Sequence, residues 1–391
     1  MSNFTVDTKS AVCLLGATGS IGDSTIDVLK HHADRFTLHS VAAASNWQKM
    51  ATIAREFDVK HLVMWSSEAA EKLSKELGRE VLCGMDGLLQ IVKDPEVDVV
   101  VNGLVGSVGC LPTLEAIKHD KRVALANKET LVMAGYCVEQ LLSEHPKASL
   151  LPVDSEHNAI FQCLAERPTK EVHHIQLTAS GGPFRTLPKE EFANITRAQA
   201  LKHPTWSMGP KITIDSSTLM NKGLEVMEAH YLFKLPYDQI KVVVHPQSIV
   251  HSMVQFVDGS LMAQLGAPDM RHPIQFALSY PERWDLNVDH VYLPDIGSLD
   301  FFAPDAEKFP CLRLAYEAGN REGTAPAILN AANEVVVPAF LDGQIEYLDI
   351  PKILEDILGK SSVIDEPDLD TILKVDQETR IFTLDYLKSK F

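Results

Sequence analysis

Short apolar runs alternate with helix-like segments along the first part of the chain. Five runs rich in apolar and β-branched residues are each followed by a segment with helical spacing of its apolar positions: 11–15, 37–44, 60–64, 97–102 and 122–126. This alternation is typical of βαβ units, whose strands form a parallel sheet. The pattern therefore predicts an α/β domain with a parallel sheet over residues 1–150.

The pattern changes after residue 150. Strand-like segments separated by turns follow at 172–178, 241–244, 248–256 and 261–265. Helical segments follow at 312–318, 326–340, 350–358 and 368–388. Between them, residues 281–310 hold four prolines and few periodic segments. We expect a central α+β domain with a partly antiparallel sheet at 151–280, an irregular linker at 281–310 and a C-terminal helical domain at 311–391.

Composition and charge limit the possible partners. The 391 residues are 45% hydrophobic and 23% charged, and no apolar run approaches the roughly 18 residues of a membrane span. The formal net charge of −17 argues against nucleic acid and anionic membranes as partners. The N-terminus does not resemble a signal peptide, and the six cysteines are scattered. We expect reduced thiols and a bacterial cytoplasmic protein, with an organellar origin and a removed transit peptide as the alternative.

A glycine loop follows the first predicted strand. Gly16, Gly19 and Gly22 lie between an apolar run and a helical pattern, which is the context of a dinucleotide-binding loop. Glycines permit close approach of a pyrophosphate, and the helix N-terminus offers N–H donors. The spacing differs from G-x-G-x-x-G, and a tight strand–helix turn without a ligand is the alternative. We interpret the first domain as Rossmann-like.

The end of the second predicted strand bears on the choice of cofactor. An NAD site commonly has an acidic residue there, which binds the ribose 2′-hydroxyl. This chain has Ala44, Ser45 and Asn46 instead, with Lys49 and Arg55 nearby. A 2′-phosphate meets no repelling carboxylate in this sequence, so the sequence favours NADPH over NADH.

Two acidic residues follow an apolar run directly after residue 150. Asp154 and Glu156 flank Ser155, and on an extended segment residues two apart point the same way. A divalent cation offsets the repulsion between two such carboxylates. A solvated acidic turn is the simpler reading of this pair alone. A second polar cluster at 215–225 favours the metal site.

The polar cluster at 215–225 adds a third carboxylate. Asn221 and Glu225 are four positions apart on a predicted helix and share one face, and Lys222 can reach the same rim. Ser216 and Ser217 are predicted at or before the helix start, where hydroxyls cap the helix and can face an anion. Asp154, Glu156 and Glu225 together offer hard oxygen ligands, which suit Mg²⁺ or Mn²⁺ better than Zn²⁺.

Other segments place polar side chains in loops. Asn127, Lys128 and Glu129 follow a strand, where open α/β sheets bind ligands, although such a pair is also ordinary surface chemistry. Ser180 lies in a glycine turn that can bind a phosphate or simply connect two segments. The loop 203–209 contains Trp206 and reads equally as a lid or as a loop anchored to the core. Three further histidines are expected to be structural: His245, His251 and His272.

Several long motifs are similar to those of one enzyme family. In chain order they are GATGSIG, ANKE, VDSEHNAIFQ, SGGPF, HPTWSMG, DSSTLMNKGLE, HPQSIVHSMV, GAPDMRHPIQ and AANE. They span nearly the whole chain, and this set resembles the 1-deoxy-D-xylulose 5-phosphate reductoisomerase family. The resemblance implies rearrangement of a ketose phosphate, by retro-aldol cleavage and re-addition, and then reduction by NADPH to 2-C-methyl-D-erythritol 4-phosphate. It also implies a homodimer and gives the central domain a role in catalysis and dimerisation.

The resemblance also assigns roles to individual residues. Metal ligands would be Asp154, Glu156 and Glu225, for Mg²⁺ or Mn²⁺ with Co²⁺ as a further possibility. The catalytic residues would be these three together with Lys128 and His203. Substrate contacts would come from Lys128, Ser155, Glu156, Ser180, His203, Ser216, Asn221, Lys222 and Glu225. NADPH contacts would come from Thr18, Gly19, Ser20, Ile21, Ala44, Ser45, Asn46, Asn127, Glu129 and Gly209. Two positions depart from the family pattern, because Ala44 and Ala179 stand where glycine is expected; the first leaves the 2′-phosphate contacts open.

Two rival functions remain at this stage. The first is a plain NADP-dependent dehydrogenase that acts on a phosphorylated or carboxylated aldehyde. Semialdehyde dehydrogenases share the glycine loop but need a nucleophilic cysteine beside a histidine base, and the sequence shows no cysteine in an obvious polar site. An NADP-sensing regulatory protein needs neither the carboxylate set nor the phosphate-binding residues. Substitution of Glu225 should therefore leave such a sensor unaffected.

Overall fold

The computed structural model describes residues 9–206 and 208–390. The first eight residues, on which the expectation of no signal peptide rests, and Ser207 of the predicted lid lie outside the described residues. The chain divides into two compact units. Unit 1 comprises Met1–Asn127, Val138–Asn158 and Asp269–Val288, and unit 2 comprises Lys128–Cys137, Ala159–Pro268 and Asp289–Phe391. Among the described residues no helix combines the length and apolar character of a membrane span.

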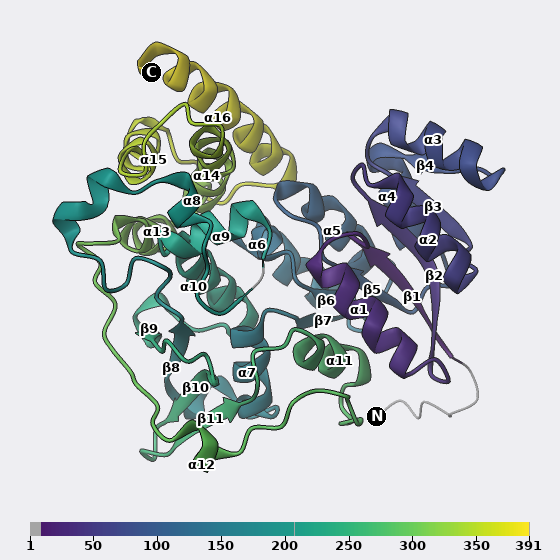
Figure 1. The fold of residues 1–391 in the computed structure, drawn as a ribbon, viewed down its shortest axis with the longest axis horizontal. Coiled ribbons are helices and arrows are strands. Elements are labelled where there is room, and N and C mark those ends of the chain that lie inside the picture. The colour runs from purple at the N-terminus through teal and green to yellow at the C-terminus, as the bar shows by residue number, and fades with distance from the viewer. Residues whose placement is uncertain (1–8, 207, 391) are drawn as a thin grey trace. The chain divides into compact units, whose positions relative to one another are not determined.

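Unit 1 contains a seven-stranded sheet in which every pair of neighbouring strands is parallel (Figure 1). The strand order is β4-β3-β2-β1-β5-β6-β7. The strands are β1 Ser10–Leu15, β2 Phe36–Ala43, β3 His61–Met64, β4 Leu82–Cys83, β5 Val99–Asn102, β6 Arg122–Leu125 and β7 Ser149–Pro152. The order reverses between β1 and β5, and open α/β sheets bind ligands beyond the carboxyl ends of the strands at such a point. The predicted parallel-sheet domain is therefore confirmed.

Helices cover this sheet, and two of them begin at side-chain caps. They are α1 Ser20–His31, α2 Trp47–Phe57, α3 Ser67–Leu77, α4 Gly84–Val92, α5 Cys110–Lys118 and α11 Arg271–Ser279. Asn46 and Ser66 cap α2 and α3 by accepting backbone N–H bonds, and Gly78 ends α3 in the left-handed conformation. Helix α11 comes from far along the chain but packs against α1, β6 and β7 (Figure 1). Arg122 fixes it further by donating a 3.0 Å hydrogen bond to the carbonyl of Leu278.

Unit 2 contains a mixed four-stranded sheet in the order β11-β10-β8-β9. The strands are β8 Val172–Ala179, β9 Ile240–Val244, β10 Val250–Phe256 and β11 Leu261–Leu265. Strand β10 is antiparallel to both of its neighbours, whereas β8 and β9 are parallel. The partly antiparallel sheet predicted for the central part of the chain is confirmed.

Helices of unit 2 build one apolar core with this sheet. The longer ones are α9 Pro210–Ser217, α10 Met220–Phe233, α13 Pro310–Arg321, α14 Ala325–Leu341, α15 Asp349–Lys360 and α16 Leu369–Lys390. Buried residues from the strands, α10 and these C-terminal helices form one continuous cluster, which includes Ile175, Leu224, Leu314 and Phe340. The C-terminal helices α14 to α16 contact one another, as predicted from the helical periodicity (Figure 1).

Two helices join the units through the chain itself. Helix α6, Lys128–Glu144, contributes Lys128–Cys137 to unit 2 and its later residues to unit 1, with non-helical backbone angles at Ala134. Helix α7, Ser155–Leu164, begins in unit 1 and continues in unit 2 from Ala159. The domain boundaries predicted at residues 150, 280 and 310 stay a prediction.

Candidate active site

The glycine loop connects β1 to α1 in unit 1, as predicted. Gly16 has a φ of +85°, and a Cβ at this position would lie 2.5 Å from the carbonyl oxygen of Gly103. A Cβ at Gly22 would lie 2.4 Å from the carbonyl oxygen of Ala17. Gly19 precedes α1 without a side-chain cap, so the first N–H groups of α1 receive no side-chain acceptor from the position before the helix. Glycine is thus required at this turn, and the helix N-terminus remains suited to an anion.

The end of β2 adjoins this loop. Ala44, Ser45 and Asn46 are exposed, and the amide oxygen of Asn46 accepts the backbone N–H of Lys49. The ammonium of Lys49 donates a 3.1 Å hydrogen bond to the carbonyl of Thr18 and forms an ion pair with Asp23. A cation therefore stands between the glycine loop and the strand end at which NADP and NAD differ.

Asn127 has a structural role that the sequence did not reveal. Its side chain is buried and donates hydrogen bonds of 2.9 Å to the carbonyls of Leu104 and Gly106. The amide nitrogen therefore holds the loop after β5 in place. The predicted contact between Asn127 and NADPH stays a prediction.

Asp154 and Glu156 do not lie on an extended segment, so the geometry predicted for this pair is wrong. Strand β7 ends at Pro152 and α7 begins at Ser155, so Asp154 precedes the helix and Glu156 lies in its first turn. The backbone N–H of Asn158 donates to the carbonyl of Asp154, which closes the first helical turn. The two half-buried carboxylates thus lie at a helix N-terminus, where the helix dipole favours negative charge. The hydroxyl of Ser155 donates a 2.6 Å hydrogen bond to Oε2 of Glu156.

The polar cluster of unit 2 centres on Glu225 in α10. The amide nitrogen of Asn221 donates a 2.6 Å hydrogen bond to its Oε1, which confirms that the two residues share a helix face. Lys222 donates to its Oε2, and the ammonium of Lys128 lies 3.6 Å from Oε1. Lys128, Lys222 and Glu225 are all buried, each no more than 5% exposed. Two ammonium groups and one carboxylate are thus buried close together in unit 2.

The glycine turn that follows Ser180 lies against the backbone of Ser216 in unit 2. Gly181 and Gly182 have φ of +84° and +68°, and a Cβ at Gly182 would lie 2.8 Å from the carbonyl oxygen of Ser216. The glycine turn therefore packs closely against the end of α9. The sequence placed Ser216 and Ser217 at or before the start of the helix that holds Glu225, and both precede α10, although Leu219 and not a serine is at its N-cap position. Both lie in the last turn of α9, and Ser217 donates to the carbonyl of Ile214.

His203 links the glycine turn to the loop that follows it. Its Nδ1 accepts the backbone N–H groups of Thr205 and Trp206 at 3.2 and 2.9 Å. The proton of the neutral imidazole is therefore assigned to Nε2, which lies 3.1 Å from the hydroxyl of Ser180 and donates to it. Trp206 is half-buried, which leaves both the lid and the anchored loop open. Gly209 precedes α9, and a Cβ there would meet nothing within 4 Å.

A buried ion-pair network in unit 2 was missed from the sequence. Lys211 lies 2.7 Å from a carboxylate oxygen of Asp215 and 3.5 Å from one of Glu129. Burial disfavours its charged form, but the carboxylates of Asp215, Glu129 and Glu334 outweigh burial and raise the pKa of Lys211. The amide of Asn333 donates to Asp215. The four-residue spacing of Lys211 and Asp215, in a helix begun by Pro210, was the available signal.

Three of the six cysteines are unsuited to a thiol mechanism. Burial raises the pKa of Cys13 and of Cys311 to about 12. Burial also raises the pKa of Cys137. Thiols with a raised pKa are poor nucleophiles, so none of these three is suited to the role that a semialdehyde dehydrogenase requires.

His245 is structural, as predicted. Its Nδ1 lies 2.8 Å from the carbonyl of Asp300, while Nε2 accepts the backbone N–H groups of Ile249 and Val250. Both ring nitrogens are thus used to hold the turn before β10.

Family models match three parts of the chain. The model described as 1-deoxy-D-xylulose 5-phosphate reductoisomerase matches residues 12–135. The models described as 1-deoxy-D-xylulose 5-phosphate reductoisomerase C-terminal domain and DXP reductoisomerase C-terminal domain match residues 150–233 and 265–382.

Curated relatives extend this similarity over nearly the full length. The 1-deoxy-D-xylulose 5-phosphate reductoisomerase of Chlorobium chlorochromatii is 51% identical over 373 residues, which cover 95% of this chain and 97% of the relative. That of Geobacillus sp. is 50% identical over 372 residues, which cover 94% and 97%. The chain belongs to the 1-deoxy-D-xylulose 5-phosphate reductoisomerase family. The resemblance drawn from the motifs is thereby confirmed.

Solved structures agree with this assignment. The reductoisomerase of Zymomonas mobilis in complex with NADPH is similar with a TM-score of 0.90 and 41% identity, covering 98% of this chain and 100% of that one. A DOX-P reductoisomerase in complex with NADPH, fosmidomycin and magnesium has a TM-score of 0.93 and 41% identity, covering 97% and 98%. The predicted fold class is therefore confirmed.

Proposed function

We propose that this chain converts 1-deoxy-D-xylulose 5-phosphate into 2-C-methyl-D-erythritol 4-phosphate, using NADPH and a divalent cation, in the non-mevalonate route to isoprenoids. The observation that carries the proposal is the buried group around Glu225, in a chain 51% identical to a reductoisomerase over 95% of its length. The relatives named above are bacterial proteins, which supports our expectation of a bacterial cytoplasmic enzyme.

The residues of unit 1 fit the nicotinamide cofactor. The glycine loop leaves no room for a Cβ at Gly16 or Gly22, and the N-terminus of α1 lacks a side-chain cap. The pyrophosphate would be bound by Thr18, Gly19, Ser20 and Ile21. The 2′-phosphate would be bound by Ala44, Ser45 and Asn46, with Lys49 as the nearby cation. Asn127, Glu129 and Gly209 remain proposed contacts for the rest of the cofactor.

The metal is assigned from donor chemistry. We assign Asp154, Glu156 and Glu225 as ligands because carboxylate oxygens are what Mg²⁺ prefers, and relatives have been solved with magnesium. Asp154 and Glu156 lie two positions apart at the start of α7, where Ser155 between them donates to Oε2 of Glu156. Mn²⁺ and Co²⁺ are alternatives with the same ligand set.

The chemistry then divides between bound groups and side chains. When bound, the cation supplies Lewis acidity for the rearrangement and NADPH supplies the hydride for the reduction. Lys128 holds a positive charge, oriented by Asn221, toward the reacting hydroxyl and carbonyl of the substrate. Ser155 and Glu156 form hydrogen bonds to the same part of the substrate.

The remaining substrate contacts orient the phosphate. Ser180, Ser216, Asn221 and Lys222 offer two hydroxyls, an amide and an ammonium within unit 2. Lys222 is buried beside Glu225, so its charge is little screened by solvent. His203 positions Ser180 through its Nε2–H. Binding energy from a remote phosphate fixes the orientation of the reacting atoms.

We propose a homodimer on the basis of β11. Among the described residues β11 is hydrogen-bonded on one side only, to β10, and its Leu261, Met262 and Leu265 are exposed. An open edge strand with apolar side chains is suited to an interface with a second copy. Replacement of Leu261 and Leu265 by lysine should shift the mass measured by analytical ultracentrifugation from dimer to monomer; a monomeric wild type would refute the proposal.

The enzymatic proposal is tested by NADPH oxidation with 1-deoxy-D-xylulose 5-phosphate, with and without Mg²⁺. The wild type should oxidise NADPH only when substrate and cation are both present, and Glu225→Gln should abolish this turnover. Glu317→Gln, an exposed change on α13, is the matched control and should retain activity. If the wild type showed no metal-dependent turnover, the proposed function would be wrong. If Glu225→Gln left NADPH-linked behaviour intact, an NADP-sensing protein would be favoured.

A further inference from the structure

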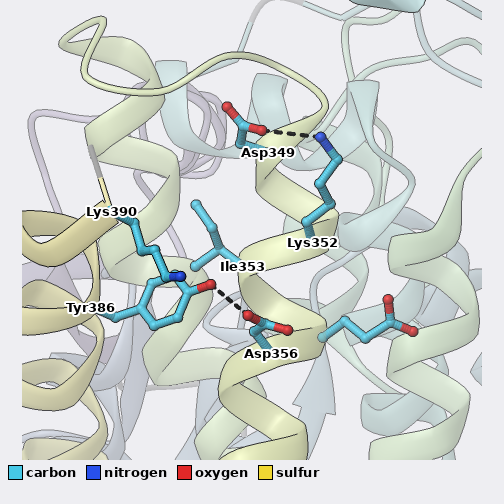
Figure 2. A pocket seen from close by; sticks show the side chains of 7 residues that line it. Asp349, Lys352, Ile353, Asp356, Tyr386 and Lys390 are labelled. Carbon is cyan, nitrogen blue, oxygen red and sulfur yellow. Dashed lines mark hydrogen bonds and ion pairs between the residues drawn. The ribbon is translucent and has the colours of Figure 1, made fainter.

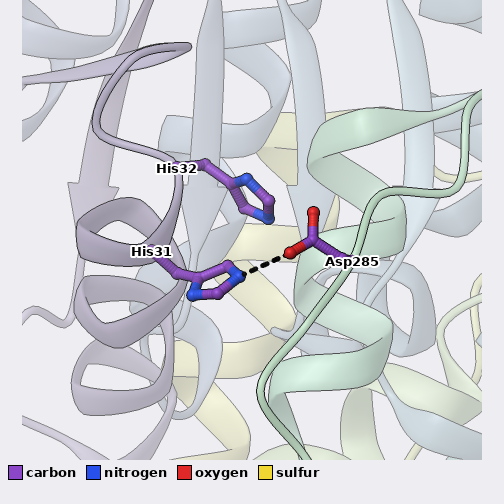
Figure 3. Close-up of side chains that lie close together, drawn as sticks. All are labelled: His31, His32 and Asp285. Atoms are coloured by element: carbon purple, nitrogen blue, oxygen red, sulfur yellow. Dashed lines mark hydrogen bonds and ion pairs between the residues drawn. The ribbon is translucent and has the colours of Figure 1, made fainter.

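Two clusters of histidine and carboxylate groups lie within unit 1, outside the proposed active site. The first joins His31, His32 and Asp285 (Figure 3). Nε2 of His32 is already hydrogen-bonded to Gln275 at 3.0 Å, and the ring packs against Trp284. Asp285 has an exposed side chain and forms only a 3.3 Å contact with His31. This cluster has the features of a surface ion pair and serves below as a control.

A pocket between α15 and α16 is a weaker candidate for a ligand site (Figure 2). Lys352 contacts Asp349, and the hydroxyl of Tyr386 donates to Asp356. None of the lining side chains has a buried polar atom that lacks a hydrogen-bond partner, so nothing in this pocket calls for a ligand.

The second cluster joins His39 of β2, His61 of β3 and Asp94, which precedes β5. Nε2 of His61 lies 3.3 Å from Oδ2 of Asp94, and Nε2 of His39 lies 4.0 Å from the same oxygen. Oε2 of Glu96 lies 3.4 Å from Nε2 of His39. All three cluster residues have a ligand atom within 4.8 Å of the others. Around a tetrahedral zinc ion with bonds of about 2.1 Å, neighbouring ligand atoms stand roughly 3.4 Å apart.

The buried ring nitrogens of His39 point to a ligand. Its side chain is only 8% exposed, yet neither ring nitrogen makes a hydrogen bond of acceptable geometry. Burying a polar group without a partner costs about 1–3 kcal/mol, so such groups normally have one. A metal ion would occupy the lone pair of one nitrogen and remove this cost.

The carboxylates of the cluster are held in place by other groups. Oδ1 of Asp94 accepts the backbone N–H of Glu96 at 2.9 Å, while Lys121 donates to the carbonyl of Asp94 at 2.7 Å. Oδ2 of Asp94 therefore remains directed toward His61. Lys60 pairs with Oε1 of Glu96 at 2.8 Å, which leaves Oε2 turned toward His39. Lys60 is half-exposed, so its charge can move away into solvent when a cation binds.

We propose that His39, His61 and Asp94 form a second metal site, for Zn²⁺ or a similar transition-metal ion, with Glu96 as a fourth ligand. Two imidazoles with carboxylates favour such ions, whereas the all-oxygen set proposed for catalysis favours Mg²⁺. His61 is the first residue of β3 and its neighbour Ser40 of β2 is in register with it. The ion thus joins β2, β3 and the segment before β5 at the amino-terminal side of the sheet. Its role is structural stabilisation of unit 1.

The test is a metal titration of the full-length protein in excess Mg²⁺, which keeps oxygen-ligand sites filled. Binding of Co²⁺ is followed by its visible absorption and by equilibrium dialysis, and Zn²⁺ by displacement of Co²⁺. The wild type should bind one more equivalent of Co²⁺ than His61→Ala. Zn²⁺ should raise the Tm of the wild type but not that of His61→Ala. His61 is about one-third exposed, so its loss should leave the fold intact.

The matched control is His31→Ala, which removes a histidine from the other cluster. It should bind the same number of equivalents as the wild type. Asp94→Asn should weaken binding in the same direction as His61→Ala. Equal binding by the wild type and His61→Ala, or loss of the equivalent in His31→Ala alone, would overturn the proposal. Turnover with Mg²⁺ should be unchanged in all three variants.

Discussion

The ammonium of Lys128 in α6 donates a 2.9 Å hydrogen bond to the amide oxygen of Asn221 in α10. The amide nitrogen of Asn221 donates in turn to Glu225, so one side chain fixes both a cation and a carboxylate. Because Lys128 is buried, it cannot reorient into solvent without losing this bond. The pair therefore holds the Lys128 ammonium in a fixed orientation, as its proposed contact with the substrate requires.

Lys128→Ala should lower kcat by about 100-fold or more, because loss of one preoriented donor typically has an effect of that size. Glu225 keeps its contact with Lys222 in this variant, so the fold should persist. Steady-state kinetics would measure the change, and circular dichroism would verify folding. Lys118→Ala, at the end of α5, is the control. A kcat close to that of the wild type would remove Lys128 from the catalytic residues.

Ser180→Ala should raise the KM for the substrate by about tenfold, which corresponds to one hydrogen bond to a charged group of about 1.4 kcal/mol or more. The oxygen of Ser180 accepts from His203 and from the backbone of Gly182, so its own proton can be donated to a phosphate. Binding of NADPH, measured by fluorescence, should not change. An equal loss of both affinities would indicate damage to the fold.

Lys49→Gln should weaken NADPH about tenfold while NADH binding stays the same, because only NADPH carries the 2′-phosphate. Lys49 contacts the carbonyl of Thr18 in the glycine loop and lies three residues after Asn46. Fluorescence titrations with NADPH and with NADH give the ratio of the two affinities directly. Arg55→Gln on the same helix, whose side chain pairs with Glu76, should leave the ratio unchanged. A parallel loss for both nucleotides would show that Lys49 only supports the loop.

Acid stability should depend on Asp269. Burial opposes its ionisation, but hydrogen bonds from Arg271 outweigh burial and hold the pKa of Asp269 below its usual 3.8. A carboxylate with a depressed pKa stabilises the folded state above the unfolded-state pKa, and this contribution is lost as the pH falls through the folded-state pKa. Urea unfolding, measured from pH 6 downward, should therefore show that the free energy of unfolding falls less with decreasing pH in Asp269→Asn than in the wild type. Asp365→Asn, in an exposed loop, should follow the wild-type pH dependence.

Local features of the site could be predicted from the sequence. The glycine loop is a strand, a turn and a helix in direct succession, so its signals lie within about fifteen residues. The shared helix face of Asn221 and Glu225 could be predicted from their four-residue spacing alone. Asp154 and Glu156 were placed on an extended segment because the apolar run before them dominated the pattern. Asp at a helix start followed by Glu in the first turn was the overlooked signal.

Other features depend on contacts between distant segments. Lys211 and Glu129 are 82 positions apart, and only the folded unit 2 brings them together. Strand β7 has four residues and gains its strand character from pairing with β6. His39, His61 and Asp94 lie on separate segments, and no sequence pattern connects them. These residues lie close together because of the register between β2 and β3, which cannot be predicted from the sequence alone.

The interleaved path of the chain affects how its parts can be exchanged. Unit 1 includes Asp269–Val288, and α11 within that segment covers α1, β6 and β7. A gene fragment that stops after β7, at Pro152, would encode every strand of the parallel sheet but omit α11, leaving apolar surface of the sheet uncovered. The parallel-sheet unit therefore cannot be transferred by recombination as one contiguous piece of the gene.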